Sequence, residues 1–333
     1  MVFITSLSVI SACGSAPRDR ADRLPAAAEP SRAPALSARP AGRVVPLPPG
    51  SEPEGVAVDP DTHTAVVALR RPDRIALVNT RSLAVTVRSA PGEARHLILV
   101  KPGGPVLLPA ENDATAYELA LPSGRVLRST PVQRQPHNAA VVGPDIWVAD
   151  ELAPAISVIN SAGNVIATLH GPVQPGGVVT AAGTVGVTDV RGARMYFYDA
   201  TTFAAEGSIT LGTGPTHAVG AGGDVAVAAD TRGGQLLLVD MATRRVVSRL
   251  AMPGGPYGLA SDPASGNVWV TLTQRNQVVQ VATTPTGMRV VATTPTVQQP
   301  NTVAVDTTSG CVYVAGVTAA RLDVTCPKDP KRP

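Results

Sequence analysis

Three of the five histidines of this chain lie close behind short turns that recur along the sequence. His137 follows a proline directly, His217 lies two residues after a proline, and His96 follows a turn that lacks one. Histidine binds transition metals, and it also takes up or releases a proton near neutral pH. A carboxylate beside it would complete either a metal site or an acid–base pair. The chemistry therefore depends on whether these turns meet in space.

The turns belong to a repeat of about 41 residues. Each unit has a Gly/Gln/Glu-Pro start, then short apolar strands separated by Gly, Asp or Pro turns. The residues at the proline position are Pro53, Glu93, Pro136, Pro175, Pro215, Pro256 and Pro300, at intervals of 40, 43, 39, 40, 41 and 44. Such a period with several strands per unit is typical of propeller blades, not of helical solenoids. We therefore predict an all-β fold, a seven-bladed β-propeller of four-stranded antiparallel blades.

The last unit ends after its third strand, at residues 321–325. The missing strand is present at the other end of the chain, as residues 42–47. Pairing of this segment into the last blade would close the ring and leave only short, protected sheet edges. We expect the propeller to span residues 42–326, followed by a flexible tail at 327–333.

Cys311 and Cys326 flank the last predicted hairpin, whose turn spans residues 317–320. Folding about that turn places the two residues opposite each other, at a separation of about 4.5–5.5 Å between Cα atoms. This suits a disulfide. The alternatives are two buried free thiols or a metal pair, and a metal is disfavoured because no His or third Cys lies nearby in sequence.

First strands line the channel of a propeller, so the residues after each turn should crowd its mouth. The predicted ligand-binding residues are Glu54, Arg95, His96, His137, Asn138, Thr216, His217, Tyr257 and Asn301. The loops between second and third strands should add Arg70, Glu111, Asp150, Glu151, Asp189, Arg191 and Asp230. The nature of any metal stays open.

Simpler interpretations exist for part of this set. Asp150, Asp189 and Asp230 recur at one place in three blades, which favours Asx-type turn bonding over chemistry. Trp147, Trp269 and Tyr313 share one strand position, which indicates packing between blades.

Charge excludes one class of partner. Residues 44–333 carry 22 basic and 22 acidic side chains, so the predicted domain has no net charge. A nucleic-acid binder needs a basic excess, and we expect no nucleic-acid partner. We expect a monomer.

The N-terminus resembles a bacterial lipoprotein signal. Residues 2–12 are uncharged and mostly apolar, and residues 10–13 (ISAC) resemble a lipobox. The resemblance implies a signal peptide at 1–12, lipidation of Cys13, and a protein anchored to the cell membrane on its outer side. Residues 14–41 are rich in Pro, Ala and Arg, which predicts a disordered tether. The alternative is a chance Cys in an apolar N-terminus.

The Pro-x-Gly starts and the VYVA-type second strands resemble YncE-like envelope propellers and, more loosely, NHL-repeat and streptogramin-lyase propellers. The resemblance covers about residues 42–325. It is compatible with a non-catalytic protein that binds a small molecule, glycan or protein at the channel mouth and needs no cofactor. The alternative is a metal-dependent lyase or lactone hydrolase, with His137 and His217 as acid and base. Glu54, Asn138 and Asn301 would then be ligands of a divalent metal, although streptogramin lyases repeat Pro-His-Gly and Pro136-His137 is followed by Asn138.

Overall fold

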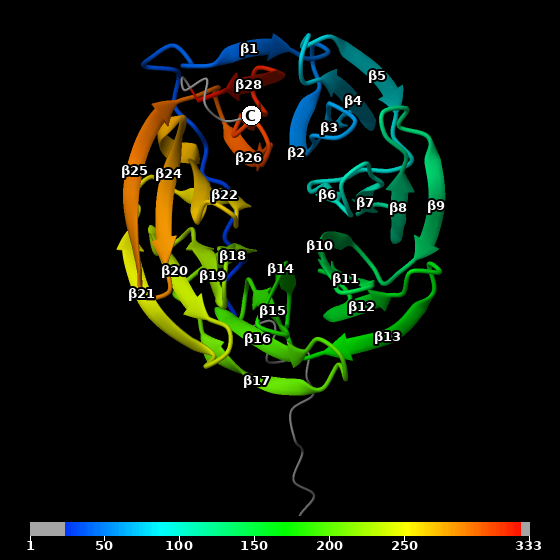
Figure 1. Cartoon of the computed structure of the whole chain (residues 1–333), viewed down its shortest axis with the longest axis vertical. Coiled ribbons are helices and arrows are strands. Elements are labelled where there is room, and N and C mark those ends of the chain that lie inside the picture. The colour runs from blue at the N-terminus through cyan, green and yellow to red at the C-terminus, as the bar shows by residue number, and fades with distance from the viewer. Residues whose placement is uncertain (1–23, 328–333) are drawn as a thin grey trace, which may run out of the picture.

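The structure is a computed structural model that describes residues 24–327. Seven four-stranded antiparallel sheets stand round a central axis, which confirms the predicted seven-bladed propeller (Figure 1). First strands are innermost and fourth strands outermost. Over residues 24–327 the only helical element is the 3₁₀ turn η1 (Thr273–Arg275), and nothing there has the length and apolarity of a membrane-crossing helix.

The strand bounds follow the predicted repeat. The first three blades are β2 (Glu52–Asp59), β3 (Thr64–Arg70), β4 (Arg74–Asn79) and β5 (Val85–Ser89); β6 (Ile98–Leu99), β7 (Val106–Ala110), β8 (Thr115–Leu119) and β9 (Val126–Pro131); and β10 (Pro136–Val142), β11 (Asp145–Asp150), β12 (Ala155–Ile159) and β13 (Val165–His170). The next three are β14 (Pro175–Ala181), β15 (Thr184–Asp189), β16 (Arg194–Asp199) and β17 (Ala205–Thr210); β18 (Pro215–Gly220), β19 (Val225–Asp230), β20 (Gln235–Asp240) and β21 (Arg245–Ala251); and β22 (Pro256–Asp262), β23 (Asn267–Leu272), β24 (Gln277–Thr284) and β25 (Gly287–Pro295). The seventh blade is β26 (Pro300–Val305), β27 (Val312–Gly316), β28 (Arg321–Thr325) and β1 (Arg43–Pro46).

Second strands are buried along most of their length because neighbouring blades cover both faces of each sheet. Every residue of β15 is buried, whereas the outermost strand β13 is largely exposed. The hydrophobic clusters accordingly lie between blades. Trp147 packs with Tyr198 of the next blade, Trp269 shares a cluster with Val312, and Tyr313 is only 1% exposed. The predicted packing role of these three aromatic positions is confirmed.

The ring is closed as predicted by the N-terminal strand. β1 pairs antiparallel with β28, in a register that places Arg43 opposite Val324 and Pro46 opposite Arg321. Val45 and Leu47 are buried in a cluster that the seventh and first blades share. Closure therefore joins the two ends of the domain within one sheet.

A disulfide joins Cys311 to Cys326, with 4.0 Å between their Cα atoms. It continues the β27–β28 register, in which Val312 lies opposite Thr325. The predicted pairing across the last hairpin is confirmed. The predicted signal peptide, Cys13 and most of the tail lie outside the described residues.

Candidate functional site

A β-bulge follows the turn proline in six of the seven blades. The pairing register shifts there, as between Pro136 and Asn138, Pro215 and Ala218, or Pro256 and Leu259. A bulge re-aims the side chains next to it. The exception is the second blade, which has Glu93 at the proline position and a first strand of only two residues.

The glycine of the Pro-x-Gly turns allows neighbouring first strands to approach closely. A Cβ atom on Gly177 would lie 3.1 Å from the Cα of His217, and one on Gly55 would lie 3.0 Å from the Cα of His96. A side chain there would push the next blade outward, which is why glycine fits the position. The channel is consequently narrow enough for histidines of different blades to meet.

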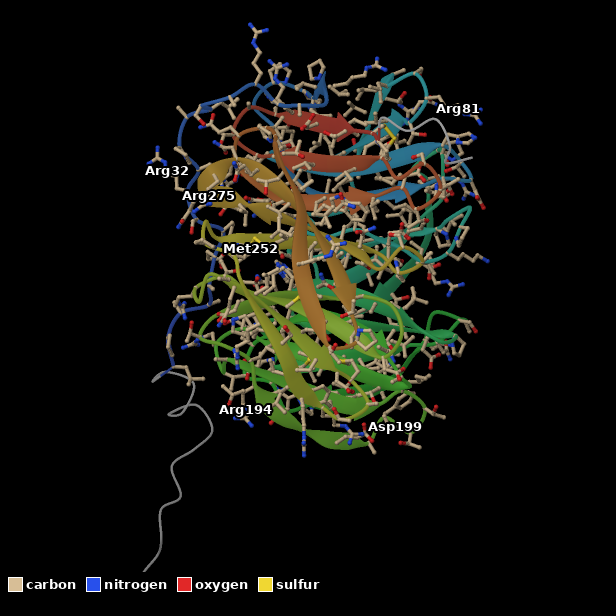
Figure 2. The ribbon with its side chains drawn as sticks, turned by 60° about the vertical axis from the view of Figure 1, so that its left-hand side comes forward. Arg32, Arg81, Arg194, Asp199, Met252 and Arg275 are labelled. Carbon is tan, nitrogen blue, oxygen red and sulfur yellow. A yellow bond between two sulfur atoms is a disulfide. The ribbon has the colours of Figure 1, made fainter. Side chains whose placement is uncertain are left out.

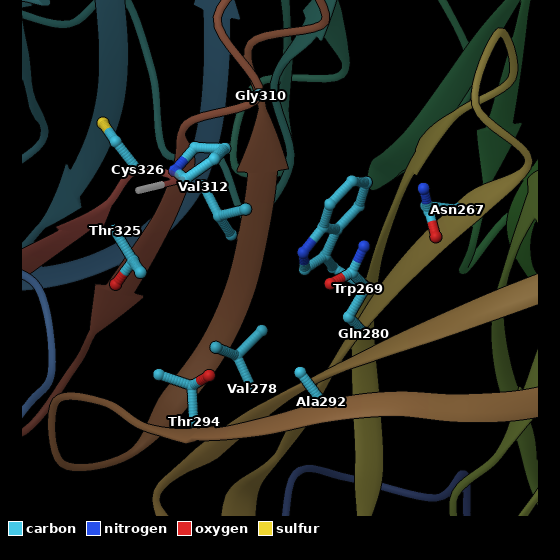
Figure 3. A pocket seen from close by; sticks show the side chains of 11 residues that line it. Asn267, Trp269, Val278, Gln280, Ala292, Thr294, Gly310, Val312, Thr325 and Cys326 are labelled. Carbon is cyan, nitrogen blue, oxygen red and sulfur yellow. The ribbon is translucent and has the colours of Figure 1, made fainter. Parts of the chain in front are cut away.

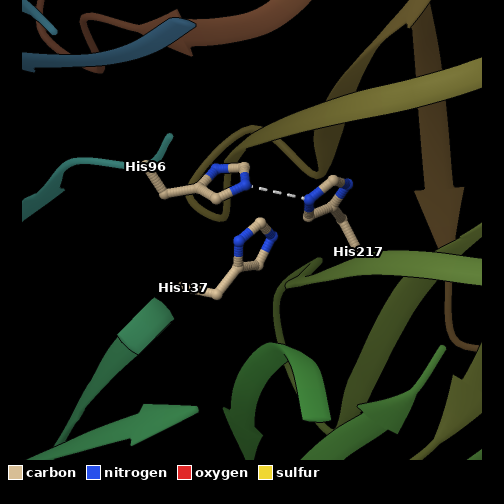
Figure 4. Close-up of side chains that lie close together, drawn as sticks. All are labelled: His96, His137 and His217. Atoms are coloured by element: carbon tan, nitrogen blue, oxygen red, sulfur yellow. Dashed lines mark hydrogen bonds between the residues drawn. The ribbon is translucent and has the colours of Figure 1, made fainter. Parts of the chain in front are cut away.

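His96, His137 and His217 form one cluster at the mouth (Figure 4). A nitrogen atom from each ring lies within 4.8 Å of the others, and the two Nε2 atoms of His96 and His217 are 3.1 Å apart. His137 and His217 are only 5% and 6% exposed. The structure thus brings together histidines of the second, third and fifth blades.

The Nδ1 atoms of two imidazoles face hydrogen-bond acceptors of the protein. The Nδ1 atom of His137 is 2.7 Å from Oε1 of Glu111 and 3.6 Å from Oε2 of Glu151. The Nδ1 atom of His217 is 3.3 Å from the carbonyl oxygen of Tyr257, whose ring lies edge-on to the imidazole. These contacts fix both ring orientations.

Burial and neighbouring charges shift the pKa values of the three histidines in different directions. Burial, with His137 and His217 adding to it, holds the pKa of His96 well below its usual value. Burial also lowers the pKa of His217 to about 3. Burial opposes protonation of His137 too, but the hydrogen bond to Glu111 and the charges of Glu151 and Glu111 outweigh it and raise its pKa. Two neutral imidazoles therefore lie beside one that is readily protonated.

Carboxylates and guanidinium groups surround the cluster. Arg95 lies 3.6 Å from Glu111, and Arg70 bridges Glu54 and Glu93. Burial raises the pKa of Glu54, against the hydrogen bond from Asn301 and the charges of Arg95 and Arg70. The mouth is a connected polar network in which charged groups have partners.

The other predicted mouth residues have different surroundings: some line a cavity, and others bond side chains of their own blade. Asn138 lines a channel cavity of about 180 Å³ together with His96 and His217. Thr216 bonds the hydroxyl of Thr231 of its own blade, at 2.8 Å, and borders the small cavity that Arg95, His137 and His217 also line. The predicted set is thus gathered at one end of the channel, with unequal roles.

The recurring aspartates are structural in two of three blades, as the turn interpretation expects. Asp189 accepts hydrogen bonds from the main-chain N–H groups of Val173, Gln174 and Gly192. Asp230 accepts them from Thr213, Gly214 and Gly233. Each carboxylate joins its own turn to the turn before its blade. Asp150 differs, because it accepts a hydrogen bond from the hydroxyl of Ser157, and burial raises its pKa to about 7.

Residues 24–36, which we name the strap, lie across the mouth instead of forming a free tether. The strap has no regular secondary structure and runs along one face of the ring, where Figure 2 labels Arg32 beside Arg275. Rim side chains donate hydrogen bonds to its carbonyl oxygens: Arg191 to Leu24 and Pro25, Arg232 to Ala26, Gln299 to Ser31, and Asn276 and Gln298 to Pro34. Composition correctly excludes a core for this segment but does not reveal that its carbonyls are bound.

The strap covers the histidines. Ala28 is 9% exposed, and with Glu29 it borders a small cavity that Arg95, His137 and His217 also line. Glu29 lies 3.4 Å from Arg95. Except for Arg95 and Arg191, the rim residues that hold the strap were not among the predicted site residues. For Gln299, the recurrence of a glutamine before the turn proline was a signal in the sequence.

A second hollow lies away from the mouth, between the sixth and seventh blades. Trp269, Val312 and Thr325 line it, and Figure 3 shows the indole at its wall. None of the predicted mouth residues borders this groove.

The sequence matches no protein-family model and no curated protein sequence. Solved structures match over most of the chain. A streptogramin B lyase has a TM-score of 0.73 at 15% identity, covering 86% of this chain and 97% of that one. Virginiamycin B lyase from Staphylococcus aureus has 0.71 at 13%, covering 85% and 98%. The RRP9 WD40 repeats have 0.74 at 11%, covering 86% and 96%. At such identities the similarity shows the fold alone: the chain is a seven-bladed β-propeller whose structural neighbours include both lyases and WD40 propellers.

Proposed function

We propose that this chain is a binding propeller of the cell envelope, attached by a lipid at Cys13, whose channel mouth holds an extended polypeptide segment. The strap carries the proposal. Its carbonyl oxygens accept hydrogen bonds from side chains of the fourth to seventh blades, and Gln299 also accepts a bond from the N–H of Ala33, at 2.7 Å. Recognition through the main chain tolerates different side chains. A second polypeptide of similar extended shape could therefore replace the strap.

Binding is tested with a labelled peptide of residues 24–36 and a protein that lacks those residues. We expect the peptide to bind the shortened protein and not the full chain, because the strap already occupies the site in the full chain. In the shortened protein, Arg232→Ala should weaken binding by roughly 2–12-fold, since this hydrogen bond is exposed to water and such a bond contributes about 0.5–1.5 kcal/mol. Fluorescence anisotropy measures the affinity.

Arg81→Ala is the matched control, because Arg81 is exposed in the turn between β4 and β5, away from the strap contacts. It should leave the affinity unchanged. Equal binding of the peptide to the full and shortened proteins, or to neither, would overturn the proposal.

The anchor is part of the same proposal, and the resemblance of residues 10–13 (ISAC) to a lipobox supports it. Leu24 lies at the mouth, and the chain from Cys13 to Leu24 can span at most about 40 Å. A lipid on Cys13 would therefore hold the mouth side of the propeller near the membrane.

Radiolabelled palmitate tests the anchor. We expect the full chain to incorporate label when expressed in bacteria and Cys13→Ala to lose it, because that thiol would be the only acylation site. Ser15→Ala is the control and should label like the unchanged chain. Equal labelling of Cys13→Ala would contradict the anchor without bearing on peptide binding.

A second candidate function is that of a metal-dependent lyase or lactone hydrolase that acts at the same mouth. The observation that favours it is the 2.7 Å contact between His137 and Glu111, a base with an orienting carboxylate. Two of the structural neighbours are lyases. Product formation separates the two functions, since binding alone yields none.

A further inference from the structure

The hydrogen bonds around His217 determine which of its nitrogen atoms is free. Its Nδ1 faces the carbonyl oxygen of Tyr257 at 3.3 Å, and a carbonyl only accepts. Nδ1 must therefore carry the proton, and in the neutral ring Nε2 presents a lone pair. That lone pair points at Nε2 of His96, 3.1 Å away (Figure 4).

His137 is oriented in the same way by a carboxylate. Glu111 Oε1 accepts from Nδ1 at 2.7 Å, which leaves Nε2 for another partner. A histidine that ligates a metal through one nitrogen and donates its other N–H to a carboxylate or a carbonyl is the usual outer arrangement of metal sites. Here Glu111 is the carboxylate acceptor for His137, and the Tyr257 carbonyl is the acceptor for His217.

We propose that His96, His137 and His217 bind one late first-row transition-metal ion of the Zn²⁺ type through their Nε2 atoms. Two imidazole nitrogens of a tetrahedral zinc ion lie about 3.3 Å apart, given Zn–N distances of roughly 2.0–2.1 Å. The observed 3.1 Å between His96 and His217 is close to that value. Imidazole ligands favour zinc, copper and nickel, whereas Mg²⁺ requires oxygen ligands.

The surrounding charge suits a cation. The carboxylates of Glu54, Glu93, Glu111 and Glu151 outnumber the guanidinium groups of Arg70 and Arg95. Three protein ligands leave a fourth position for water or a ligand. The channel cavity of about 180 Å³, which His96 and His217 line, adjoins the cluster on the side away from the strap.

The test uses the full chain, stripped with a chelator and titrated with Zn²⁺, Co²⁺ or Mg²⁺ in a calorimeter. We expect one Zn²⁺ per chain, an intense four-coordinate visible spectrum with Co²⁺, and no heat with Mg²⁺. His96→Ala and His217→Ala should each abolish stoichiometric binding. Glu111→Gln should weaken Zn²⁺ binding roughly 10–100-fold, as the loss of an outer-shell carboxylate does.

The control is His170→Ala, which removes an exposed histidine at the end of β13. It should leave Zn²⁺ affinity unchanged, and circular dichroism verifies that each variant is folded. Zn²⁺ binding that survives His96→Ala and His217→Ala, or the absence of Zn²⁺ binding to the full chain, overturns the site. Neither result affects the peptide experiment, so this proposal and the proposed binding function fail separately.

Discussion

A chain that begins at residue 49 is expected to lose cooperative folding, whereas a chain that begins at Pro40 keeps it. The longer chain retains β1 and the hydrogen bond from the N–H of Ala41 to the carbonyl of Pro295. The shorter chain leaves β28 as an open sheet edge, because β1 is its only partner on that side. It also loses Val45 and Leu47, which are each 5% exposed in the cluster between the seventh and first blades.

Burial of these two side chains contributes about 1.5–3 kcal/mol each, and the lost strand hydrogen bonds add to this. The sum is a large part of the roughly 5–15 kcal/mol by which a domain is stable. Urea unfolding followed by tryptophan fluorescence and circular dichroism measures the effect. The two probes should give one sharp transition for the chain from Pro40 and a broad or absent one for the chain from residue 49. Identical transitions would contradict ring closure by β1.

The difference between these two chains also separates the strap from the fold. Both lack residues 24–36, so any loss confined to the shorter one comes from β1 alone. The strap contacts the rim mainly through exposed polar side chains, and such bonds contribute little to stability in water. Its removal should therefore open the mouth without unfolding the ring.

Periodic features of the sequence predicted the fold. The proline turns gave the blade boundaries, and the run at residues 225–230 coincides with β19, while residues 321–325 coincide with β28. These features are local, since a turn and a buried strand depend on the residues that form them. The pairing of Cys311 with Cys326 was predictable for the same reason: one hairpin sets it.

Contacts across the channel were not predictable in this way. His96 and His217 are 121 residues apart, and their contact depends on the channel radius. That radius depends on close approaches such as Gly177 against His217, which no spacing in the sequence expresses. The strap was missed for a different reason. Most of its side chains are small, and most of the groups that bind are its carbonyl oxygens, which every residue has.

Replacing Cys311 and Cys326 by serine is expected to lower the free energy of unfolding by about 3 kcal/mol, the chain-entropy value for a loop of 15 residues. The bridge joins the start of β27 to the end of β28, and β28 is the strand on which β1 closes the ring. Without the bridge, β27 and β28 can separate at the end of the hairpin that lies opposite its turn.

The measurement is urea unfolding of the unchanged chain and the double serine variant, each with and without a thiol reductant. The reductant should move the midpoint of the unchanged chain down to that of the variant and leave the variant where it is. This pairing distinguishes the bridge from the loss of two partly buried sulfur atoms, which would destabilise the variant but not the reduced chain. If the variant and the oxidised chain unfold at the same urea concentration, the bridge does not hold the closing blade, and closure depends on β1 alone.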